Sequence, residues 1–403
     1  MSEWKKVKLG ELYEVHNGLS KGRQFFGSGY PFLTFSNVFN NWFLPEELES
    51  LVQSSEKERQ TCSIKKGDVF ITRTSETMDE LGMSSVALKD YPNATYNGFT
   101  KRLRPLTDEV IPEYIGYYLR SPKFRGKFMA FSTMTTRASL ANDDLLSMEV
   151  DIPEKAIQQR IATILSRYDS LIENYQKQIK LLEESAQRLY KEWFIDLRFP
   201  GYENTKIVDG VPEGWEKKKI KDLVDLKSGY AFKSSAFVEK GKYKIVTIKN
   251  VKDGVFDGDN VSYLNSVPEK MPSHCILQTG DILLSLTGNV GRICMVVGDN
   301  YLLNQRVAKL ESKFPAFTYC LFRHYDTFVA INNLANGAAQ QNVSPIRIGE
   351  MDMLVANDKI MHHFEKAAEN IRTNILNLFS QIRHLTEARD RLLPKLMSGE
   401  IEV

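Results

Sequence analysis

The sequence predicts an α+β protein in which two similar mixed α/β domains are separated by a long antiparallel two-helix coiled coil. Three observations support this fold class. The 403 residues exceed what one hydrophobic core usually spans. The chain repeats itself once at a long period. Each copy of the repeat ends in a segment whose apolar residues have coiled-coil spacing.

The globular part of each copy carries the same short patterns in the same order. Residues 4–18 match 215–229 with the same spacing from Trp to Gly, residues 30–38 match 243–251, and residues 67–72 match 280–285. In the last pair a Gly-Asp turn leads into a buried apolar strand. The apolar runs at 69–72, 245–248 and 282–286 predict strands, and the stretches 110–130 and 315–333 predict helices.

The helical part of each copy has an apolar seam with alternating spacings of four and three. Two consecutive fours interrupt the alternation at Tyr168 and Ile172, and again at Ile371 and Ile375, so both copies share one stutter. Two unrelated amphipathic helices would not share it. The predicted seam residues are Ile161, Tyr168, Ile172, Tyr175, Ile179, Leu182 and Leu189 in the first helix, and Phe364, Ile371, Ile375, Leu378, Ile382, Leu385 and Leu392 in the second.

The repeat predicts the domain boundaries. We expect a first globular domain at 1–152, a central helix at 153–196, a linker at 197–211, a second globular domain at 212–356, and a distal helix with its tail at 357–403. Asp151-Ile-Pro-Glu and Asn357-Asp are typical helix starts. Pro394 is expected to end the second helix early. Off the seam, Leu165 and Leu171 could either dock partner helices or widen the core of the coiled coil.

The long helices constrain how two heads can be presented. A helix from Ile157 to Trp193 would be roughly 55 Å long. The linker could permit a parallel return of the second helix, but pseudo-twofold closure favours the antiparallel form. Two like domains on a stiff spacer suit a reader of two half-sites on duplex DNA. A coiled-coil scaffold whose twin domains bind protein or another polymer is the alternative.

Composition and motifs exclude several classes. The formal charge of +2 does not indicate a polycation, and any DNA contact must come from local patches. No apolar run reaches membrane-span length, and the first residues lack a signal core, so we expect a cytoplasmic protein. The four cysteines lie far apart, which disfavours a metal site. Gly22 and Gly27 have Walker A spacing, but Ser28 stands where lysine is required. No catalytic residues are predicted.

Candidate DNA contacts are polar side chains that follow strands or fill loops, since Arg suits guanine and Asn or Gln suits adenine. In Gly288-Asn-Val-Gly291 a tight turn is favoured over a phosphate nest. In the first domain the candidates are Arg73, Thr74, Ser75, Lys101, Arg102, Arg104, Thr135, Thr136 and Arg137. In the second domain they are Ser285, Thr287, Asn289, Arg292, Asn304, Gln305, Arg306, Gln340, Gln341 and Asn342.

The chain resembles the specificity subunit of type I restriction-modification systems over nearly its whole length. The motifs that carry the resemblance are Ile152-Pro-Glu with Gln158-Gln-Arg-Ile, Leu189-Tyr-Lys-Glu-Trp-Phe, Pro212-Glu-Gly-Trp, Gly280-Asp-Ile-Leu-Leu-Ser and Leu393-Pro-Lys-Leu-Met-Ser-Gly-Glu. Met361-His-His-Phe departs from the pattern at the second helix.

The resemblance implies a non-catalytic subunit that binds double-stranded DNA. Each globular domain would read one part of a bipartite target, and the coiled coil would set the spacer length. The implied partners are two methyltransferase subunits that use S-adenosylmethionine, and restriction subunits that translocate DNA with ATP and Mg. No cofactor is expected in this chain itself.

Overall fold

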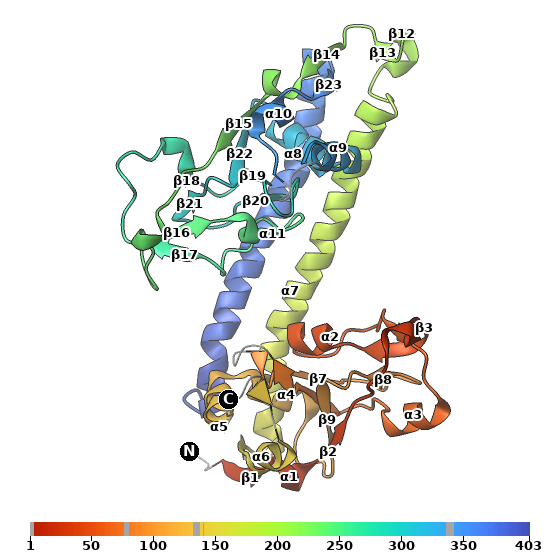
Figure 1. Cartoon of the computed structure of the whole chain (residues 1–403), viewed down its shortest axis with the longest axis vertical. Coiled ribbons are helices and arrows are strands. Elements are labelled where there is room, and N and C mark those ends of the chain that lie inside the picture. The colour runs from red at the N-terminus through yellow and green to blue at the C-terminus, as the bar shows by residue number, and fades with distance from the viewer. Residues whose placement is uncertain (1–3, 76–79, 132–137, 140, 336–341) are drawn as a thin grey trace. The chain divides into compact units, whose positions relative to one another are not determined.

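The computed structural model describes residues 4–75, 80–131, 138–139, 141–335 and 342–403. The chain divides into two compact units. Unit 1 comprises residues 1–172 and 385–403, and unit 2 comprises residues 173–384. Each unit therefore contains one globular domain together with a part of both long helices, α7 (Lys155–Tyr190) and α11 (Asp358–Ser398). Figure 1 labels the elements of both units.

Unit 1 is built on a four-stranded antiparallel sheet in the order β2-β9-β5-β7. Its strands are β2 (Tyr13–Asn17), β9 (Thr100–Pro105), β5 (Val69–Thr72) and β7 (Ser84–Val86). A second sheet joins β4 (Leu51–Val52), β3 (Phe26–Leu33) and β8 (Thr95–Tyr96), and β3 and β8 are parallel. Strand β1 (Lys5–Lys8) pairs with β11 (Glu149–Ile152), and β6 (Thr74–Ser75) pairs with β10 (Ala138–Ser139). The helices are α1 (Leu9–Leu12), α2 (Phe35–Asn40), α3 (Glu56–Thr61), α4 (Pro112–Arg120), α5 (Pro122–Phe131) and α6 (Asn142–Ser147).

Unit 2 repeats this plan. Its main sheet has the order β15-β22-β19-β20, with strands β15 (Val224–Ser228), β22 (Val307–Ser312), β19 (Ile282–Ser285) and β20 (Ile293–Met295). The second sheet holds β17 (Ser262–Leu264), β16 (Tyr243–Val246), β21 (Tyr301–Leu303) and β18 (Ile276–Leu277), and β16 and β21 are parallel. Strand β14 (Glu216–Lys219) pairs with β23 (Asp352–Val355), and β12 (Ile207–Val208) pairs with β13 (Val211–Pro212). The helices are α8 (Pro315–Arg323), α9 (Tyr325–Ala335) and α10 (Pro345–Gly349).

The helix predictions for the globular parts are confirmed, and so are the strands predicted at 69–72 and 282–286. The run 245–248 is a strand only as far as Val246, where β16 ends, and a 3-10 helix begins at Ile248. Strands β5 and β19 are buried at every residue, as expected from their unbroken apolar runs. Each follows a Gly-Asp turn in which the carboxylate accepts a backbone N–H, at 2.7 Å from Lys65 to Asp68 and at 2.8 Å from Gln278 to Asp281. Helices α4 and α5, and α8 and α9, occupy the predicted helical stretches.

Within each unit the two long helices run antiparallel. In unit 1, Ile161 and Leu165 share a core with Leu393 and Leu396, and the Asp169 carboxylate pairs with Arg389 at 2.6 Å. In unit 2, the rings of Tyr190 and Phe364 lie 6.2 Å apart, and residues 178–182 lie opposite residues 374–381. In both units, residues further along α7 contact residues that come earlier in α11. The parallel return that the sequence left open is therefore excluded.

The predicted seam residues are all buried or partly buried. Ile161, Ile179, Phe364 and Ile375 are at most 7% exposed. Of the off-seam leucines, Leu165 is fully buried and widens the core, whereas Leu171 is 44% exposed.

Two predictions about the helix ends were wrong in part. Pro394 lies inside α11, which continues to Ser398. Proline removes one N–H donor, but Leu393, Leu396 and Met397 bury their side chains on either side of it, and this packing carries the helix onward. Asn357 caps α11 as expected, because its Oδ1 accepts the Ile360 N–H at 3.1 Å. Asp151 instead belongs to β11, and α7 begins only after Glu154.

Candidate nucleic-acid interface

One corner of unit 2 gathers several predicted DNA-contact residues. At the end of β21 the chain makes a turn in which Asn304 Oδ1 accepts the Arg306 N–H at 3.4 Å and the Asn304 carbonyl accepts the Val307 N–H at 3.0 Å. The Gln305 N–H donates to the Tyr230 carbonyl, and the Leu286 N–H donates to the Arg306 carbonyl, both at 3.0 Å. We call this set, residues 229–230, 286–289, 304–306 and 342, the unit 2 corner.

Unit 1 has the same corner, formed by residues 17–20, 72–73 and 97–99. Asn97 Oδ1 accepts the Phe99 N–H at 2.7 Å, and the Asn97 carbonyl accepts the Thr100 N–H at 3.0 Å. The Gly98 N–H donates to the Leu19 carbonyl at 2.9 Å, and the Arg73 N–H donates to the Phe99 carbonyl at 3.0 Å. Each of these bonds has its counterpart in unit 2. The repeat therefore extends to the backbone of the corner.

A glycine in each corner permits a close backbone approach. A Cβ built on Gly18 would lie 2.2 Å from the Asn97 carbonyl oxygen, and one built on Gly229 would lie 2.3 Å from the Asn304 carbonyl oxygen. Real Cβ atoms essentially never approach so closely. These two glycines end the matching segments 4–18 and 215–229 of the repeat. Both copies need glycine at this position because any side chain there would clash with the Asn turn.

In unit 2 the corner presents polar side chains to solvent. Asn289, Gln305, Arg306 and Asn342 are exposed, and Asn304 is half-buried, as is Arg292 beside the corner. Thr287 is buried, and its backbone bridges to Asn342. These exposed donors and acceptors are of the kinds that read base edges or hold phosphates.

Ser285 lies next to the unit 2 corner and holds its loop in place. It is fully buried, its Oγ donates to the Asn289 carbonyl, and it accepts the Arg292 N–H at 3.0 Å. Gly288 and Gly291 both have positive φ in this loop between β19 and β20. These two glycines let the chain reverse direction between the strands.

In unit 1 the predicted basic cluster of Lys101, Arg102 and Arg104 does not form a free cationic surface. The Lys101 ammonium donates to Asn142 Oδ1, Arg102 donates to the Ser63 carbonyl at 2.8 Å, and Arg104 pairs with Asp68 at 2.7 Å. Burial and the nearby Arg73 charge lower the pKa of Lys101, and the Asp68 hydrogen bond raises the pKa of Arg104. These cations are not free because β9 lies between β2 and β5 in the sheet, where its side chains donate to acceptors within the protein.

The exposed groups of the unit 1 corner are different. Arg73 is half-buried, and its guanidinium donates to Asn17 Oδ1 at 3.3 Å. Phe99 is 57% exposed at the position where unit 2 has Arg306. Phe99 is not among the predicted contact residues, although its match with Arg306 in the repeat points to it. For Thr74 and Ser75 the structure describes the backbone, which pairs as β6 with β10. Thr135, Thr136, Arg137, Gln340 and Gln341 lie outside the described residues.

Neither a metal centre nor a membrane span is found in the described part of the chain. No cluster of three or more His, Cys, Asp or Glu residues there could hold a metal ion. No helix among those residues has both the length and the apolar character needed to cross a membrane. All four cysteines are buried and free.

Known proteins resemble the chain over its full length. The type I restriction enzyme MjaIX specificity subunit of Methanocaldococcus jannaschii is 26% identical, with all of this chain and 94% of that protein covered. The HindI specificity subunit of Haemophilus influenzae is 24% identical, with both chains covered completely. A solved type I restriction-modification S subunit from M. genitalium shares the fold, with a TM-score of 0.57, 17% identity, and coverage of 98% of this chain and 96% of that one.

A family model also matches each repeat separately. It describes the type I restriction modification DNA specificity domain and matches residues 1–184 and 212–350. These two segments contain both corners and together make up most of the chain. The protein therefore belongs to the family of type I restriction-modification DNA specificity subunits, the non-catalytic components that recognise a DNA sequence.

Proposed function

We propose that the two globular domains read the two parts of a divided duplex DNA target, each through its corner. One observation carries this proposal: the hydrogen bonds that form the Asn turn are the same in both units, whereas the side chains at its tip differ. The tip holds Gly98 and Phe99 in unit 1, and Gln305 and Arg306 in unit 2. A constant scaffold with variable exposed tips suits two readers of unlike half-sites.

The unit 2 corner carries the polar reading groups. Arg306 can donate two parallel hydrogen bonds to guanine, and Gln305, Asn289 or Asn342 can pair with adenine in the same way. The Arg306 backbone is held at both its N–H and its carbonyl, so its side chain starts from a fixed point. In unit 1, Arg73 supplies the cation beside the tip, and Phe99 supplies an apolar contact to a thymine methyl group or a base step.

We further propose that α7 and α11 set the length of the unread spacer, because both helices continue from one unit into the other. The partners would be two methyltransferase subunits that use S-adenosylmethionine, and restriction subunits that use ATP and Mg. The chain's 53 lysines and arginines are almost balanced by 51 acidic residues, so its nonspecific attraction for phosphates should be modest and tight DNA binding is expected to need the methyltransferase. Equal affinity of the lone chain and the assembled complex across a salt series would contradict this.

The test is a map of modified adenines in DNA exposed to the chain together with its methyltransferase partner. Arg306→Ala should relax one position in one half of the target by about 1–3 kcal/mol, a factor of roughly 5 to 150, and should leave the other half unchanged. Arg306→Lys is the matched control, because it keeps the charge and can still donate to guanine but lacks the rigid guanidinium fork, so it should relax the position less than alanine does. An unchanged target with both variants would refute the assignment of the corner. Binding to protein or another polymer in place of DNA would favour the scaffold alternative.

A further inference from the structure

The chain that leaves each corner carries an exposed phenylalanine at the same distance from it. Phe26 lies eight residues after Gly18, and Phe237 lies eight residues after Gly229. The seven residues between glycine and phenylalanine differ at every position between the two units. The two rings nevertheless have nearly the same exposure, 41% for Phe26 and 38% for Phe237. The repeat has thus kept a surface ring in a stretch where every residue before it has changed.

The same local structure precedes both rings. A short 3-10 helix comes directly before each of them, at Arg23–Phe25 in unit 1 and at Ser234–Ala236 in unit 2. The backbone N–H of Phe26, and that of Phe237, donates to the carbonyl of the first residue of its helix. Because this turn is made by backbone hydrogen bonds, it forms in both units although the sequences differ.

The edge of the second sheet fastens each segment at its far end. In unit 1 the Phe25 carbonyl accepts the N–H of Gln53, which follows β4, at 2.8 Å. In unit 2 the Val238 N–H donates to the carbonyl of Tyr263 in β17 at 3.1 Å. Each segment is therefore held at the corner by its glycine and at the sheet edge next to its phenylalanine, and the ring has a defined place on the surface.

The segments around these rings are basic. Residues 15–45 of unit 1 include no aspartate or glutamate; Lys21 pairs with Glu58 of α3 at 2.8 Å, and Arg23 is exposed. Residues 226–252 of unit 2 include seven lysines and one acidic residue. The lysines nearest to the ring in that sequence are all exposed, namely Lys233, Lys240 and Lys242. An apolar ring among exposed cations suits duplex DNA, which offers phosphates beside apolar sugars and base steps.

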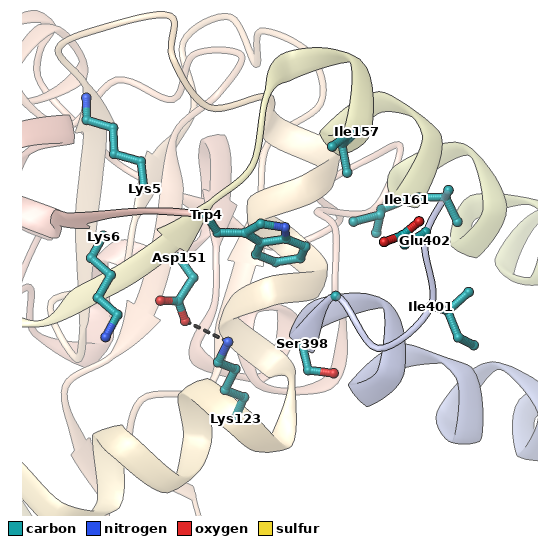
Figure 2. A pocket seen from close by; sticks show the side chains of 12 residues that line it. Trp4, Lys5, Lys6, Lys123, Asp151, Ile157, Ile161, Ser398, Ile401 and Glu402 are labelled. Atoms are coloured by element: carbon teal, nitrogen blue, oxygen red, sulfur yellow. Dashed lines mark ion pairs between the residues drawn. The ribbon is translucent and has the colours of Figure 1, made fainter. Parts of the chain in front are cut away.

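The pocket beside Trp4 in unit 1 has a different character (Figure 2). Lys123 on its wall already pairs with Asp151 at 2.9 Å, and Glu402 also lines it. Trp215, which the repeat aligns with Trp4, is buried. That pocket therefore lacks both properties of the phenylalanine segments, an excess of cations and an exposed ring that both units share.

We infer that Phe26 and Phe237 each rest against the DNA duplex beside the half-site that their corner reads, and that this contact is independent of sequence. The assignment rests on the proposed function. Eight extended residues span at most about 28 Å, less than the roughly 34 Å of one DNA turn, so each ring can reach the duplex next to its corner. A ring common to both units suits a feature common to both half-sites, and the sugars and phosphates are the same at every base pair.

A photoreactive residue identifies what each ring contacts. The full chain, with p-benzoylphenylalanine in place of Phe237 or Phe26, is assembled with its methyltransferase partner on labelled target DNA and irradiated. Both positions should give cross-links to DNA. The control position is Tyr325, which is 73% exposed and begins α9 where α5 begins with Pro122, so the repeat does not preserve it. Cross-links to the methyltransferase in place of DNA, or no more DNA product than at Tyr325, would overturn the inference.

Binding measurements supply the second test. Phe237→Ala should weaken binding to the target and to an unrelated duplex equally, by about five- to tenfold, because the exposed part of one ring is no longer buried. Phe26→Ala should do the same, and Phe26→Leu, which preserves apolar packing on Phe32, should weaken binding less. Tyr325→Ala should bind like the wild type. The double variant Phe26→Ala/Phe237→Ala should lose about 25-fold or more, with an unchanged map of modified adenines.

The two levels of the argument can fail separately. If Arg306→Ala relaxes the target but both phenylalanine variants bind DNA as tightly as the wild type, the proposed function stands and the inference about the rings is wrong. A changed target sequence in Phe237→Ala would contradict a contact that ignores sequence. If the wild-type complex does not bind the target at all, the proposed function fails and this inference fails with it.

Discussion

Replacing Gly229 by alanine should damage the unit 2 corner specifically. The new Cβ would lie 2.3 Å from the Asn304 carbonyl oxygen, whereas ordinary contacts begin at 3.4 Å, so the two backbones must separate by about 1 Å. Asn304 forms the turn that carries Gln305 and Arg306, so its displacement also moves these two residues. Overpacking of this kind costs about 1–3 kcal/mol of folding free energy, which a domain of this size can withstand.

The effect on recognition should be larger than the effect on folding. Loss of one well-placed base contact costs about 1–3 kcal/mol, and the shift disturbs both of the proposed contacts, Gln305 and Arg306. We expect Gly229→Ala to weaken binding to the target by about 30-fold or more, which corresponds to about 2 kcal/mol, with relaxed sequence preference in one half only. The assay is modified-adenine mapping with the methyltransferase partner, together with competition binding against targets altered in either half.

Two control variants sharpen this prediction. Gly18→Ala makes the same clash with Asn97 in unit 1 and should relax the opposite half of the target. Gly126→Ala lies in α5, where a Cβ meets nothing within 4 Å, and should leave recognition unchanged. The reasoning is refuted if Gly229→Ala, shown to be folded by circular dichroism, keeps the wild-type preference in both halves.

Three further outcomes can be measured. Burial opposes ionisation of Asp151, but hydrogen bonds from Lys123 and Tyr118 outweigh it and hold the pKa of this carboxyl below its usual value. The ionised carboxylate therefore stabilises the fold fully above about pH 4, and this contribution is lost as the pH falls below that. Asp151→Asn should therefore cost about 1.5–3 kcal/mol near neutral pH and less in acid, as chemical denaturation at several pH values would reveal. Burial raises the pKa of the Cys294 and Cys320 thiols, so a thiol reagent should label them only on unfolding, which mass spectrometry can follow. One heptad inserted into both α7 and α11, at points that face each other, adds about 10 Å of helix. The modification map should then show a DNA spacer about three base pairs longer. An unchanged spacer would contradict the proposed role of the helices.

The sequence predicted those features that depend on a repeating pattern. The seam from Ile161 to Leu189 and its copy on α11 could be predicted from the sequence, because a buried apolar residue recurs at every turn of a helix. Strands β5 and β19 could be predicted because both their faces are buried, which requires an unbroken run of apolar residues. In these cases a residue's neighbours in sequence determine its environment.

The candidate site was harder to predict because its environment comes from distant residues. Arg104 reads as a surface cation until the fold brings Asp68, 36 positions away, to 2.7 Å from it. Phe99 is apolar and was not among the predicted contacts, yet the Asn97 turn holds it at the surface. Pro394 reads as a helix stop, but the packing of Leu393 and Leu396 outweighs one lost hydrogen bond. No local pattern encodes these tertiary partners.

The corner separates what must stay constant from what can change. Gly18, Gly229 and the two Asn turns are fixed by backbone geometry, and a substitution there disturbs the fold of the loop. Phe99 and Arg306 are exposed at the tip, where most substitutions alter the free energy of unfolding by less than about 0.5 kcal/mol. Two copies of one domain can therefore diverge in what they bind without diverging in how they fold. Because the tips are free to vary in this way, a repeated reader need not read a repeated sequence, and an asymmetric target is the expected product of a symmetric scaffold.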